Sequence, residues 1–396
     1  MFCGFLLARA GIDVVVLEKH ADFLRDFRGD TIHPSTLELM YELGVLEDFL
    51  LRPHQELSQI SAQIDDFTVA VADFSHLPTH CKFVGLMPQW DFLNFIAEKG
   101  KAYPAFHLRM ETEVTDLLVE DGRVAGVRAQ SPRGALEVHA DLTIGADGRR
   151  SIVREKAGLQ VLDLGAPIDV LWMRVSREPS DPVRALGRFR AGKILVTIDR
   201  GEYWQCAYVI PKGAFDAVRQ RGLASFQQEI AGIAPFLRER LSELKDWNDV
   251  KLLTVAVDRL RQWSRTGLLC IGDSAHAMSP IGGVGINLAI QDAVAAANIL
   301  ADPLTHGPVS DERLREVQRR REFPTRVTQG FQVFAHKRFI GPALRDARPI
   351  TRLPLALKLL QMFPILRRIP ARLVGIGVRP EHVRTPEVKV RPSHSR

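Results

Sequence analysis

Residues 267–300 read GLLCIGDSAHAMSPIGGVGINLAIQDAVAAANIL, and this stretch decides the fold. An apolar run at residues 268–271 predicts a strand, which leads through Gly272 and Asp273 into a loop before a long helix opens at Ile286 and Asn287. Glycines let a backbone approach a phosphate, and a helix start offers unpaired amides. The loop contains Pro280, Gly282, Gly283 and Gly285. An ionised Asp273 only accepts hydrogen bonds, which suits sugar hydroxyls. The stretch therefore predicts a nucleotide-like ligand, and a plain glycine-rich connection is the alternative.

The first twenty residues, MFCGFLLARAGIDVVVLEKH, predict a helix, a turn and a strand. Four residues recur at the three-and-four spacing of a buried helical stripe: Phe2, Phe5, Leu6 and Ala10. Gly11 closes this helix, and residues 12–17 form an apolar run of strand length that ends at Glu18. A carboxylate in that place can accept the ribose hydroxyls of an adenosine nucleotide. The helix lacks a capping residue before it, which raises the question of what stands in front of Met1.

Two further segments add groups that suit an anionic ligand. In LTIGADGRRSIVREKAG, Asp147 and Gly148 end a predicted strand. Arg149 and Arg154 follow within a few residues, and Arg28 stands in a loop after the first strand. Each feature alone is more often plain surface. Their combination in this order favours a nucleotide site.

Composition excludes several classes of protein. The chain has 396 residues, 46% hydrophobic and 25% charged, which fits a globular protein of two or three domains. Four scattered cysteines predict reduced thiols in the cytoplasm, with neither a disulfide framework nor a metal site. The net charge of +6 comes with arginines near the C-terminus, as in RRREFPTR, but no aromatic residues alternate with them as stacking platforms. We therefore expect a solvated basic surface on packed helices, no nucleic-acid partner and no membrane-spanning segment.

The remaining patterns outline the order of elements. A helix capped near Ser35 or Thr36 is followed by strand-like residues 58–86, a helix in MPQWDFLNFIAEK and a hairpin around Asp121 and Gly122. Strand-like segments fill residues 166–265, with one helical stretch, RGLASFQQEIAGIAPFLRERL. The C-terminal remainder is helical, and we expect its prolines to divide it: Pro324, Pro342, Pro349, Pro354, Pro364 and Pro370.

Together, Glu18, GADGRRSIVR and IGDSAHAMSPIGGVGINLAIQDA resemble the group A, single-component FAD-dependent aromatic hydroxylases, typified by p-hydroxybenzoate hydroxylase. The resemblance implies that Asp273 contacts the ribityl chain of FAD and Pro280 the flavin ring. It places the backbone of Gly283, Gly285, Ile286 and Asn287 along the pyrimidine edge and phosphates. It relates Asp147 to both FAD and NAD(P)H. Three more positions match FAD contacts of the family: Arg28, Gln89 and Val114.

The same resemblance implies an α/β fold with a three-layer, Rossmann-like FAD-binding domain, an inserted mixed β-sheet domain for the substrate, and C-terminal helices. We expect the FAD domain in residues 1–57, 88–165 and 266–302, the substrate domain in 58–87 and 166–265, and the helical region in 303–396. Members of the family begin with a strand and a GxGxxG turn, which are missing before Phe2. We expect them to be encoded in frame upstream of Met1, and an upstream stop codon would favour a degenerate protein that binds without FAD.

The implied reaction is hydroxylation of an aromatic or polyketide-like small molecule, with NADPH or NADH reducing FAD and O₂ reacting to give a flavin C4a-hydroperoxide. A flavin-dependent halogenase or reductase of the same fold is the alternative. No catalytic side chain is assigned, and His276 is expected to be structural. Tyr203, Trp204 and Tyr208 lie where the family binds substrate, although alternating strand aromatics more often belong to a core. The helices of KLLQMFPILRRIPARLVGIG are expected to pack on the flavin domain, with contact to a membrane surface as the alternative.

Overall fold

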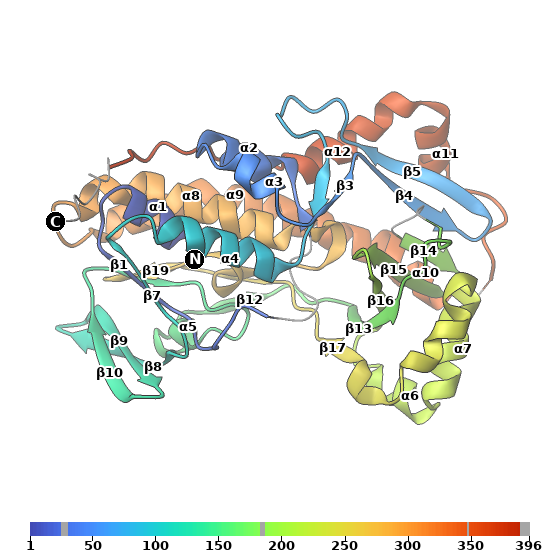
Figure 1. Cartoon of the computed structure of the whole chain (residues 1–396), viewed down its shortest axis with the longest axis horizontal. Coiled ribbons are helices and arrows are strands. Elements are labelled where there is room, and N and C mark those ends of the chain that lie inside the picture. The colour runs from blue at the N-terminus through green and yellow to red at the C-terminus, as the bar shows by residue number, and fades with distance from the viewer. Residues whose placement is uncertain (25–30, 183–186, 347, 389–396) are drawn as a thin grey trace.

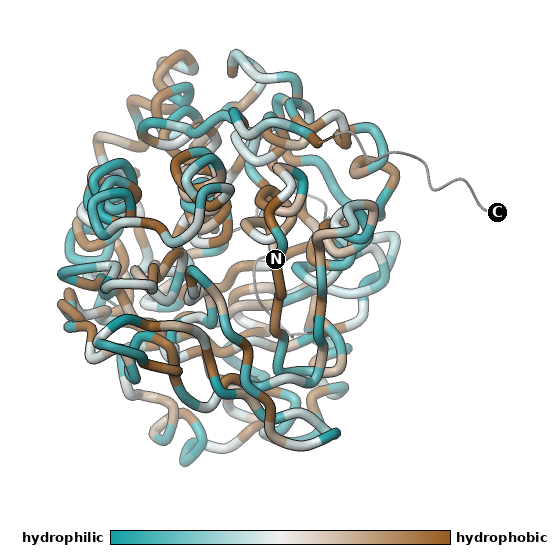
Figure 2. The backbone as a smooth tube through the Cα atoms, turned by 90° about the vertical axis from the view of Figure 1, so that its left-hand side faces the viewer, coloured by the Kyte–Doolittle hydropathy of each residue, from teal (hydrophilic) through white to brown (hydrophobic). Residues whose placement is uncertain are grey.

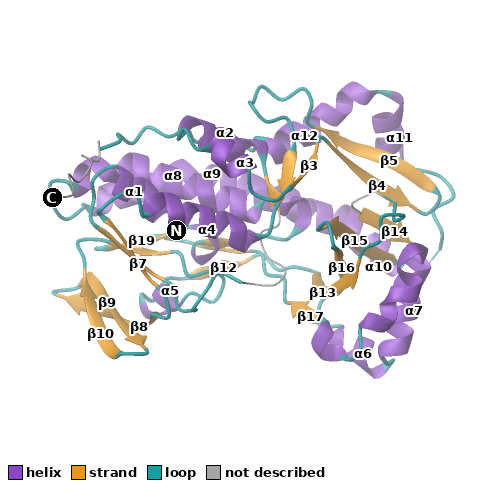
Figure 3. Cartoon of the chain, viewed as in Figure 1, coloured by secondary structure: helices purple, strands orange, loops and turns teal. Residues whose placement is uncertain are grey.

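The computed structural model describes residues 1–24, 31–182, 187–346 and 348–388. Two parts lie side by side (Figure 1). In one part, layered helices cover several short sheets, and in the other a seven-stranded sheet has helices packed on both faces (Figure 3). This α/β class, with a second part built on a mixed sheet, confirms the predicted fold. The residue boundaries of the domains stay a prediction.

The first part is built on parallel strand pairs. Its strands are β1 (Val14–Leu17), β7 (Phe106–Arg109), β11 (Thr143–Gly145), β19 (Ser264–Arg265) and β20 (Leu268–Cys270). β1 pairs in parallel with β7, and β11 pairs in parallel with β20, which also carries β19 antiparallel at its other edge. Because β11 and β20 are parallel, the residues that follow them, Asp147 and Asp273, lie toward the same edge of this sheet.

Four helices cover these sheets. They are α1 (Phe2–Arg9), α4 (Gln89–Gly100), α8 (Gly285–Leu304) and α9 (Asp311–Ala335). α1 packs against α4 and α8, and α8 packs against α9. The stripe predicted in the first helix is buried, with Phe5 2% and Leu6 0% exposed, and Gly11 adopts φ +87° in the turn before β1. The predicted helix, turn and strand at the start of the chain are therefore confirmed.

Smaller sheets complete this part. They are formed by β8 (Glu113–Glu120), β9 (Arg123–Ser131) and β10 (Gly134–His139); by β12 (Val161–Asp163), β18 (Asp258–Leu260) and β21 (His276–Ala277); and by β2 (Thr31–Ile32), β3 (Gln55–Leu57) and β6 (Val84–Leu86). The predicted hairpin turn is present, since Asp121 and Gly122 both have positive φ between β8 and β9. A short helix, α5 (Ile152–Lys156), follows β11.

The helix predicted to be capped at Ser35 or Thr36 begins slightly earlier. α2 (Pro34–Glu42) has His33 at its N-cap and Pro34 as its first residue, a position in which the missing proline N–H costs no hydrogen bond. Gly44, with φ +68°, then separates α2 from α3 (Leu46–Leu50).

The second part is a mixed sheet in the order β17-β13-β16-β15-β14-β4-β5. Its strands are β4 (Gln59–Ile64), β5 (Phe67–Asp73), β13 (Ile168–Ser176), β14 (Gly187–Arg190), β15 (Lys193–Asp199), β16 (Tyr203–Pro211) and β17 (Lys251–Leu253). Only the β14–β4 pair is parallel, so strands from residues 59–73 join a sheet built mainly from residues 168–253.

One face of this sheet is covered by α6 (Phe215–Gln220), α7 (Leu223–Ile233) and the 3₁₀ segment η1 (Pro235–Glu243). The single helical stretch predicted over residues 221–241 is wrong in this respect, because it divides at Ala234. Pro235 has no N–H to continue the α-helical ladder, so the chain continues as a 3₁₀ segment. The other face of the sheet packs on β6 and on the C-terminal helices.

The C-terminal helices are α9, the π-helical turn η5 (His336–Ile340), α10 (Gly341–Arg345), α11 (Leu355–Met362), the 3₁₀ turn η6 (Pro364–Arg367) and α12 (Arg368–Gly375). Proline divides this region at fewer points than predicted. Pro342, Pro354 and Pro364 stand at or just before element starts, but α9 continues through the buried Pro324. Packing against α8 therefore outweighs the loss of one backbone hydrogen bond.

The largest core lies between the helices and sheets of the first part, and a second fills the space between the seven-stranded sheet and α7. The outer loops are mainly hydrophilic (Figure 2). All four cysteines are free and buried. Among the described residues, Ile281–Leu304 is long and apolar enough to cross a membrane, but 61% of its apolar window is buried within the structure, as befits a core helix.

Candidate functional site

The glycine loop between β20 and α8 presents backbone amides. Gly282 and Gly283 have φ +78° and +62°, and α8 begins at Gly285, one residue before the predicted start at Ile286. Val284, at the N-cap of α8, has no side-chain oxygen that could accept from the first amides of the helix. These amides lie at the positive end of a 20-residue helix, the arrangement of donors that suits an anion.

Asp273 and Arg149 form a polar corner beside this loop. Nε of Arg149 donates to Oδ2 of Asp273 over 3.1 Å, and Nη2 donates to the carbonyl oxygen of Met278 over 3.2 Å. Nη1 of Arg149 is buried and has no hydrogen-bond partner among the described residues. The Asp273 side chain is about one-third exposed. The corner therefore offers one donor and one carboxylate to a ligand at the start of α8.

Asn287 fixes a neighbouring strand against the loop. Its Oδ1 accepts from the amide of His33 (2.9 Å) and the hydroxyl of Thr36 (2.8 Å), and its Nδ2 donates to the carbonyl oxygens of Thr31 and Gly283. The hydroxyl of Thr31 also donates to Gly283 O over 2.9 Å. The side chain of Asn287 is thus committed to holding the loop, and its backbone amide remains at the first turn of α8.

His33 stays neutral in this environment. It is 1% exposed, and its Nδ1 is 2.8 Å from the carbonyl oxygen of Val374 in α12. Burial lowers the pKa of His33 to about 4, although hydrogen bonds to the carbonyls of Val374 and Gly282 oppose the shift. A neutral ring that donates to Val374 ties α12 to the glycine loop.

A buried ionic network lies behind the loop. Asp292, on α8, accepts from His276 Nε2 (2.5 Å), Arg321 Nε (3.0 Å) and the amide of Gly272 (3.1 Å). Burial alone would raise the pKa of Asp292, but His276 and Arg321 outweigh it and lower the pKa. Arg321 is 1% exposed and also contacts Glu381 at 3.3 Å. The prediction of a solvated basic surface for RRREFPTR is therefore wrong for Arg321. His276 is buried in this network, as expected for a residue with a structural role.

α9 holds the segment that precedes the glycine loop. Nε2 of Gln332 donates to the carbonyls of Ser279 and Ile281, and Gln332 Oε1 accepts from the amide of Ser279. The hydroxyl of Ser279 lies 2.8 Å from Nε2 of His336. The sequence analysis missed these positioning residues, although Gln332 and His336 share a helix face four residues apart.

Two other predicted site residues, Glu18 and Gln89, lie outside the glycine loop. Glu18, half-buried after β1, accepts from the amide of His20 (3.0 Å), and its carbonyl accepts from Thr112, two residues before Val114 in β8. Gln89 begins α4 just after β6, whose Leu86 pairs with Thr31 beside the glycine loop.

Asp147 lies at the same sheet edge as Asp273 but is exposed, and its Oδ2 accepts from the amide of Val153 in α5 over 3.1 Å. Pro280 is half-buried before η4 (Ile281–Gly283). Arg28 lies outside the described residues. The structure thus brings Asp273, Pro280 and residues 283–287 together in the segment between the end of β20 and the first turn of α8, and it places Glu18 near Val114.

The strand aromatics point away from this site. Trp204 and Tyr208 are 3% and 4% exposed in the core beneath α7, where Tyr208 donates to Glu229 (2.7 Å) and Trp204 to Asp181 (2.7 Å). Tyr203 is half-buried, with the Arg174 guanidinium 3.8 Å from its ring centre. Their assignment to the core, the interpretation favoured from sequence, is confirmed for Trp204 and Tyr208.

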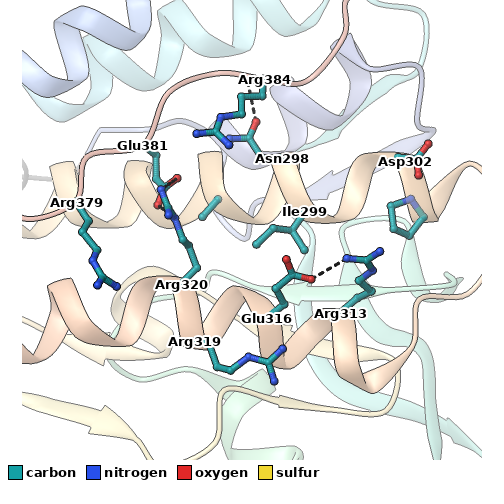
Figure 4. Close-up of a pocket in the computed structure, with 12 residues that line it drawn as sticks. Asn298, Ile299, Asp302, Arg313, Glu316, Arg319, Arg320, Arg379, Glu381 and Arg384 are labelled. Carbon is teal, nitrogen blue, oxygen red and sulfur yellow. Dashed lines mark hydrogen bonds and ion pairs between the residues drawn. The ribbon is translucent and has the colours of Figure 1, made fainter.

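A cleft of about 610 Å³ lies elsewhere, along the C-terminal half of α8 (Figure 4). Five arginines line it, but Arg313 pairs with Glu316 (2.8 Å) and Arg320 with Glu381 (2.8 Å). None of the predicted ligand contacts belongs to its lining. We therefore place the functional site at the glycine loop.

Comparison with known proteins identifies the family. The sequence model of a family described as "FAD binding domain" matches residues 1–330. The chain belongs to this family. It is 33% identical to 6-methylpretetramide 4-monooxygenase of Streptomyces rimosus over 346 residues, covering 85% of this chain and 81% of that enzyme. It is 25% identical to para-nitrophenol 4-monooxygenase of a Pseudomonas strain over 333 residues, covering 80% and 79%. The prediction of an FAD-dependent monooxygenase is thereby confirmed.

Solved structures of this fold agree. PqsL of Pseudomonas aeruginosa, described as a probable FAD-dependent monooxygenase, superposes with a TM-score of 0.72 at 18% identity, covering 87% of this chain and 94% of that one. The p-nitrophenol 4-monooxygenase PnpA of Pseudomonas putida gives a TM-score of 0.71 at 20% identity, covering 93% and 94%. The flavin-dependent brominase Bmp2 reaches 0.73 at 14% identity, covering 94% and 91%, so the fold alone does not fix the reaction.

The glycine loop fits the cofactor of the FAD binding family. It offers the uncapped amides of α8, the exposed part of the Asp273 carboxylate and the unpartnered Nη1 of Arg149. At Gly283 a Cβ atom would stand 2.2 Å from Oγ1 of Thr31, so only glycine lets the two segments approach this closely. Backbone donors beside a carboxylate are the groups that a phosphate and a polyol chain require.

Proposed function

We propose that this protein hydroxylates an aromatic or polyketide-like small molecule with O₂, using FAD that is reduced by NADPH or NADH. The observation that carries the proposal is the 33% identity, over 85% of the chain, to an enzyme named for hydroxylating 6-methylpretetramide. Relatives named for para-nitrophenol and protoasukamycin, at 25% and 28% identity, support the same reaction class.

In this proposal the glycine loop holds the flavin end of FAD. Asp273 accepts hydrogen bonds from the ribityl hydroxyls, and the amides of Gly285 and Ile286 donate to the phosphates or the pyrimidine edge. Arg149 orients Asp273 and directs its free Nη1 at the same ligand. FAD, when bound, supplies the redox chemistry that activates O₂. The residues of the chain bind it, orient it and exclude water.

Glu18 and Val114 are proposed for the adenosine end. Their neighbourhood supports this, because Thr112 links the residue after β1 to the start of β8. Gln89 is proposed as a further contact, since α4 begins close to the strand that carries Thr31. Arg28 and Asp147 keep their predicted roles as expectations.

The substrate is proposed to lie against the sheet face opposite Trp204 and Tyr208. This face carries Val170, Trp172 and Ala207 and packs toward β6 and α12. α12 in turn reaches the glycine loop through Val374 and His33. These side chains are 2–8% exposed, so the substrate would meet the border of this packed apolar layer, which suits a planar aromatic ligand better than a charged one.

The test begins with the FAD content of the purified protein. We expect bound FAD, and NADPH or NADH oxidation that increases when a phenolic polyketide is added, with a product heavier by one oxygen atom. Asp273→Asn should lower FAD occupancy, whereas Asp216→Asn, on the exposed surface of α6, should leave it unchanged. Failure of the purified protein to bind FAD would refute the proposal. Equal FAD occupancy in Asp273→Asn and Asp216→Asn would refute the role of Asp273.

Halogenation is the alternative that the structural neighbours support. The brominase Bmp2 and the chondrochloren halogenase CndH superpose with TM-scores of 0.73 and 0.72. The same assay run with bromide and chloride distinguishes the two reactions, because a halogenated product has a different mass and isotope pattern from a hydroxylated one.

A further inference from the structure

The outer face of α11 is apolar and faces solvent. Leu355, Leu359 and Met362, at positions i, i+4 and i+7, share one helix face and are 73%, 37% and 60% exposed. Leu357 and Leu360, on the inner side, are half-buried. A surface helix normally turns its apolar stripe inward, so this second stripe needs its own explanation.

The apolar surface continues beyond α11. Phe363 is 50% exposed, Ile365 63% and Ile369 66%. Residues 355–369 therefore hold six exposed large apolar side chains, on elements at one edge of the molecule (Figure 1). We call this set, Leu355, Leu359, Met362, Phe363, Ile365 and Ile369, the α11–α12 surface.

The α11–α12 surface is held in place by hydrogen bonds. Nε2 of Gln361 donates to the carbonyl of Thr68 in β5 over 3.2 Å. Nε of Arg367 donates to the carbonyl of Leu360 over 2.8 Å, which joins η6 to α11. Ala371 and Gly375 of α12 are buried, and a Cβ on Gly375 would meet Leu77 at 2.8 Å. The surface is thus presented by a packed scaffold.

Positive charge surrounds this surface. Residues 337–372 contain nine basic residues and one acidic residue, a net charge of +8. The whole chain has a net charge of +6, so the rest of the chain is net negative. Four of the cations, Arg352, Lys358, Arg368 and Arg372, are exposed and form no ion pair with the described residues. The single acid, Asp346, pairs with Arg348 at 3.0 Å.

We propose that the α11–α12 surface docks on an anionic lipid bilayer. Exposed leucine, methionine, phenylalanine and isoleucine side chains enter the boundary of the acyl chains, while the surrounding arginines and lysine meet lipid phosphates. A second copy of the chain fits less well, because a two-fold symmetric contact through this surface would bring the two sets of unpaired cations together. The proposal does not depend on the redox function.

Docking would place the glycine loop near the lipid. α12 begins beside the exposed Ile369, and Val374, about 8 Å further along its axis, accepts from His33. The same short helix therefore connects the apolar surface to the proposed flavin site. An apolar substrate dissolved in the bilayer would have a short path to that site.

The test is flotation of the purified full chain with vesicles. We expect it to float with vesicles that contain phosphatidylglycerol, and at least tenfold less with vesicles of phosphatidylcholine alone. The variant Leu359→Ser, Met362→Ser should lower the floated fraction at least tenfold, and Lys358→Glu, Arg368→Glu should do the same. Leu51→Ser is the matched control, since Leu51 is an 84% exposed leucine next to α3.

Circular dichroism and the unfolding temperature of each variant distinguish misfolding from loss of vesicle binding. Equal flotation of the chain and the α11 variants, or no flotation with anionic vesicles, would overturn the proposal. Light scattering adds a separate outcome: a dimer that the α11 substitutions dissociate, in a protein that does not bind vesicles, would assign the surface to a second copy. Loss of FAD binding would leave the flotation result unaffected, so the two proposals fail independently.

Discussion

Replacing Gly283 by alanine should destabilise the glycine loop more than replacing Gly282 or Gly285. Gly283 has φ +62°, and a Cβ there would stand 2.2 Å from Oγ1 and 3.1 Å from Cβ of Thr31. Gly282 has φ +78°, but its nearest neighbour, Val284 Cγ1, is 3.5 Å away. At Gly285 the nearest atom is 3.8 Å away, and the residue begins α8. The three positions therefore separate backbone strain from steric overlap.

The expected magnitudes follow from these distances. A left-handed backbone costs a residue with a Cβ about 1–2 kcal/mol, which is the whole expected effect of Gly282→Ala. In Gly283→Ala, forcing the Thr31 hydroxyl aside adds about 1–3 kcal/mol of overpacking and about 1 kcal/mol for its lost hydrogen bond, giving a total of roughly 3–6 kcal/mol. Gly285→Ala should change stability by less than about 1 kcal/mol, in the stabilising direction.

Urea unfolding of the three variants measures these differences, and FAD occupancy reports the geometry of the loop. The double variant Thr31→Ala, Gly283→Ala tests the cause, because it removes Oγ1 and Cγ2 of Thr31. It should be more stable than Gly283→Ala alone by about 1–3 kcal/mol. If instead the two substitutions simply add, or if Gly282→Ala and Gly283→Ala lose the same stability, the close approach of Thr31 is not what selects glycine.

Three more outcomes are expected. The folded-state pKa of His33 lies near 4, below its ordinary 6.5, so the unfolded chain binds the proton first as the pH falls. About 3 kcal/mol of stability is therefore lost between pH 6.5 and pH 4. In urea unfolding, the stability of His33→Asn should depend less on pH across this range. Asp292→Asn should cost about 3–5 kcal/mol in thermal or urea unfolding, since it removes one of the two carboxylates that pair with the buried Arg321. Tyr208→Phe should cost about 1 kcal/mol through the lost Glu229 hydrogen bond yet leave substrate KM unchanged, and a raised KM would place the tyrosine in the substrate site instead.

The sequence predicted the parts of the fold whose signals are local. The helix, turn and strand of residues 2–17, the hairpin at Asp121 and the strand, loop and helix of residues 268–304 each carry their own periodicity and glycines. Proline residues predicted the helix boundaries less well. Pro235 changes α7 to a 3₁₀ turn, whereas Pro324 lies inside α9 because contacts with α8 outweigh a missing hydrogen bond. Such an outcome depends on packing between distant segments, which local patterns do not contain.

The candidate site was predictable to the same extent. Asp273 and the glycines stand in one contiguous motif, so their proximity follows from the sequence. The groups that hold the motif come from elsewhere: Thr31 and His33 from β2 and the residue after it, Gln332 from α9, and Arg149 from beyond β11. Each is an ordinary polar residue, and only the fold reveals which carbonyl or carboxylate it meets.

Arg321 shows why a run of charges can mislead. Of the three arginines at 319–321, Arg319 pairs with the exposed Glu312, Arg320 with Glu381, and Arg321 is buried against Asp292 and Glu381. Adjacent helical positions are about 100° apart, so neighbours in a charge run face different surroundings. The run of arginines determines the local net charge, and the direction in which each position faces around the helix determines which arginine is buried.

The buried network also connects the site to the end of the described chain. Asp292 accepts from the amide of Gly272, which precedes Asp273, and Arg321 carries the interaction on to Glu381. The segment after Glu381 continues to Val388, whose amide donates to the carbonyl of Arg9 in α1 over 2.9 Å. Gly272 has φ +61°, and its amide is held by the Asp292 carboxylate, whose negative charge is balanced by Arg321 of α9, an arginine that Glu381 also contacts. Perturbing Glu381 should therefore change the geometry of Asp273 through Arg321 and Asp292, without any contact between Glu381 and the ligand.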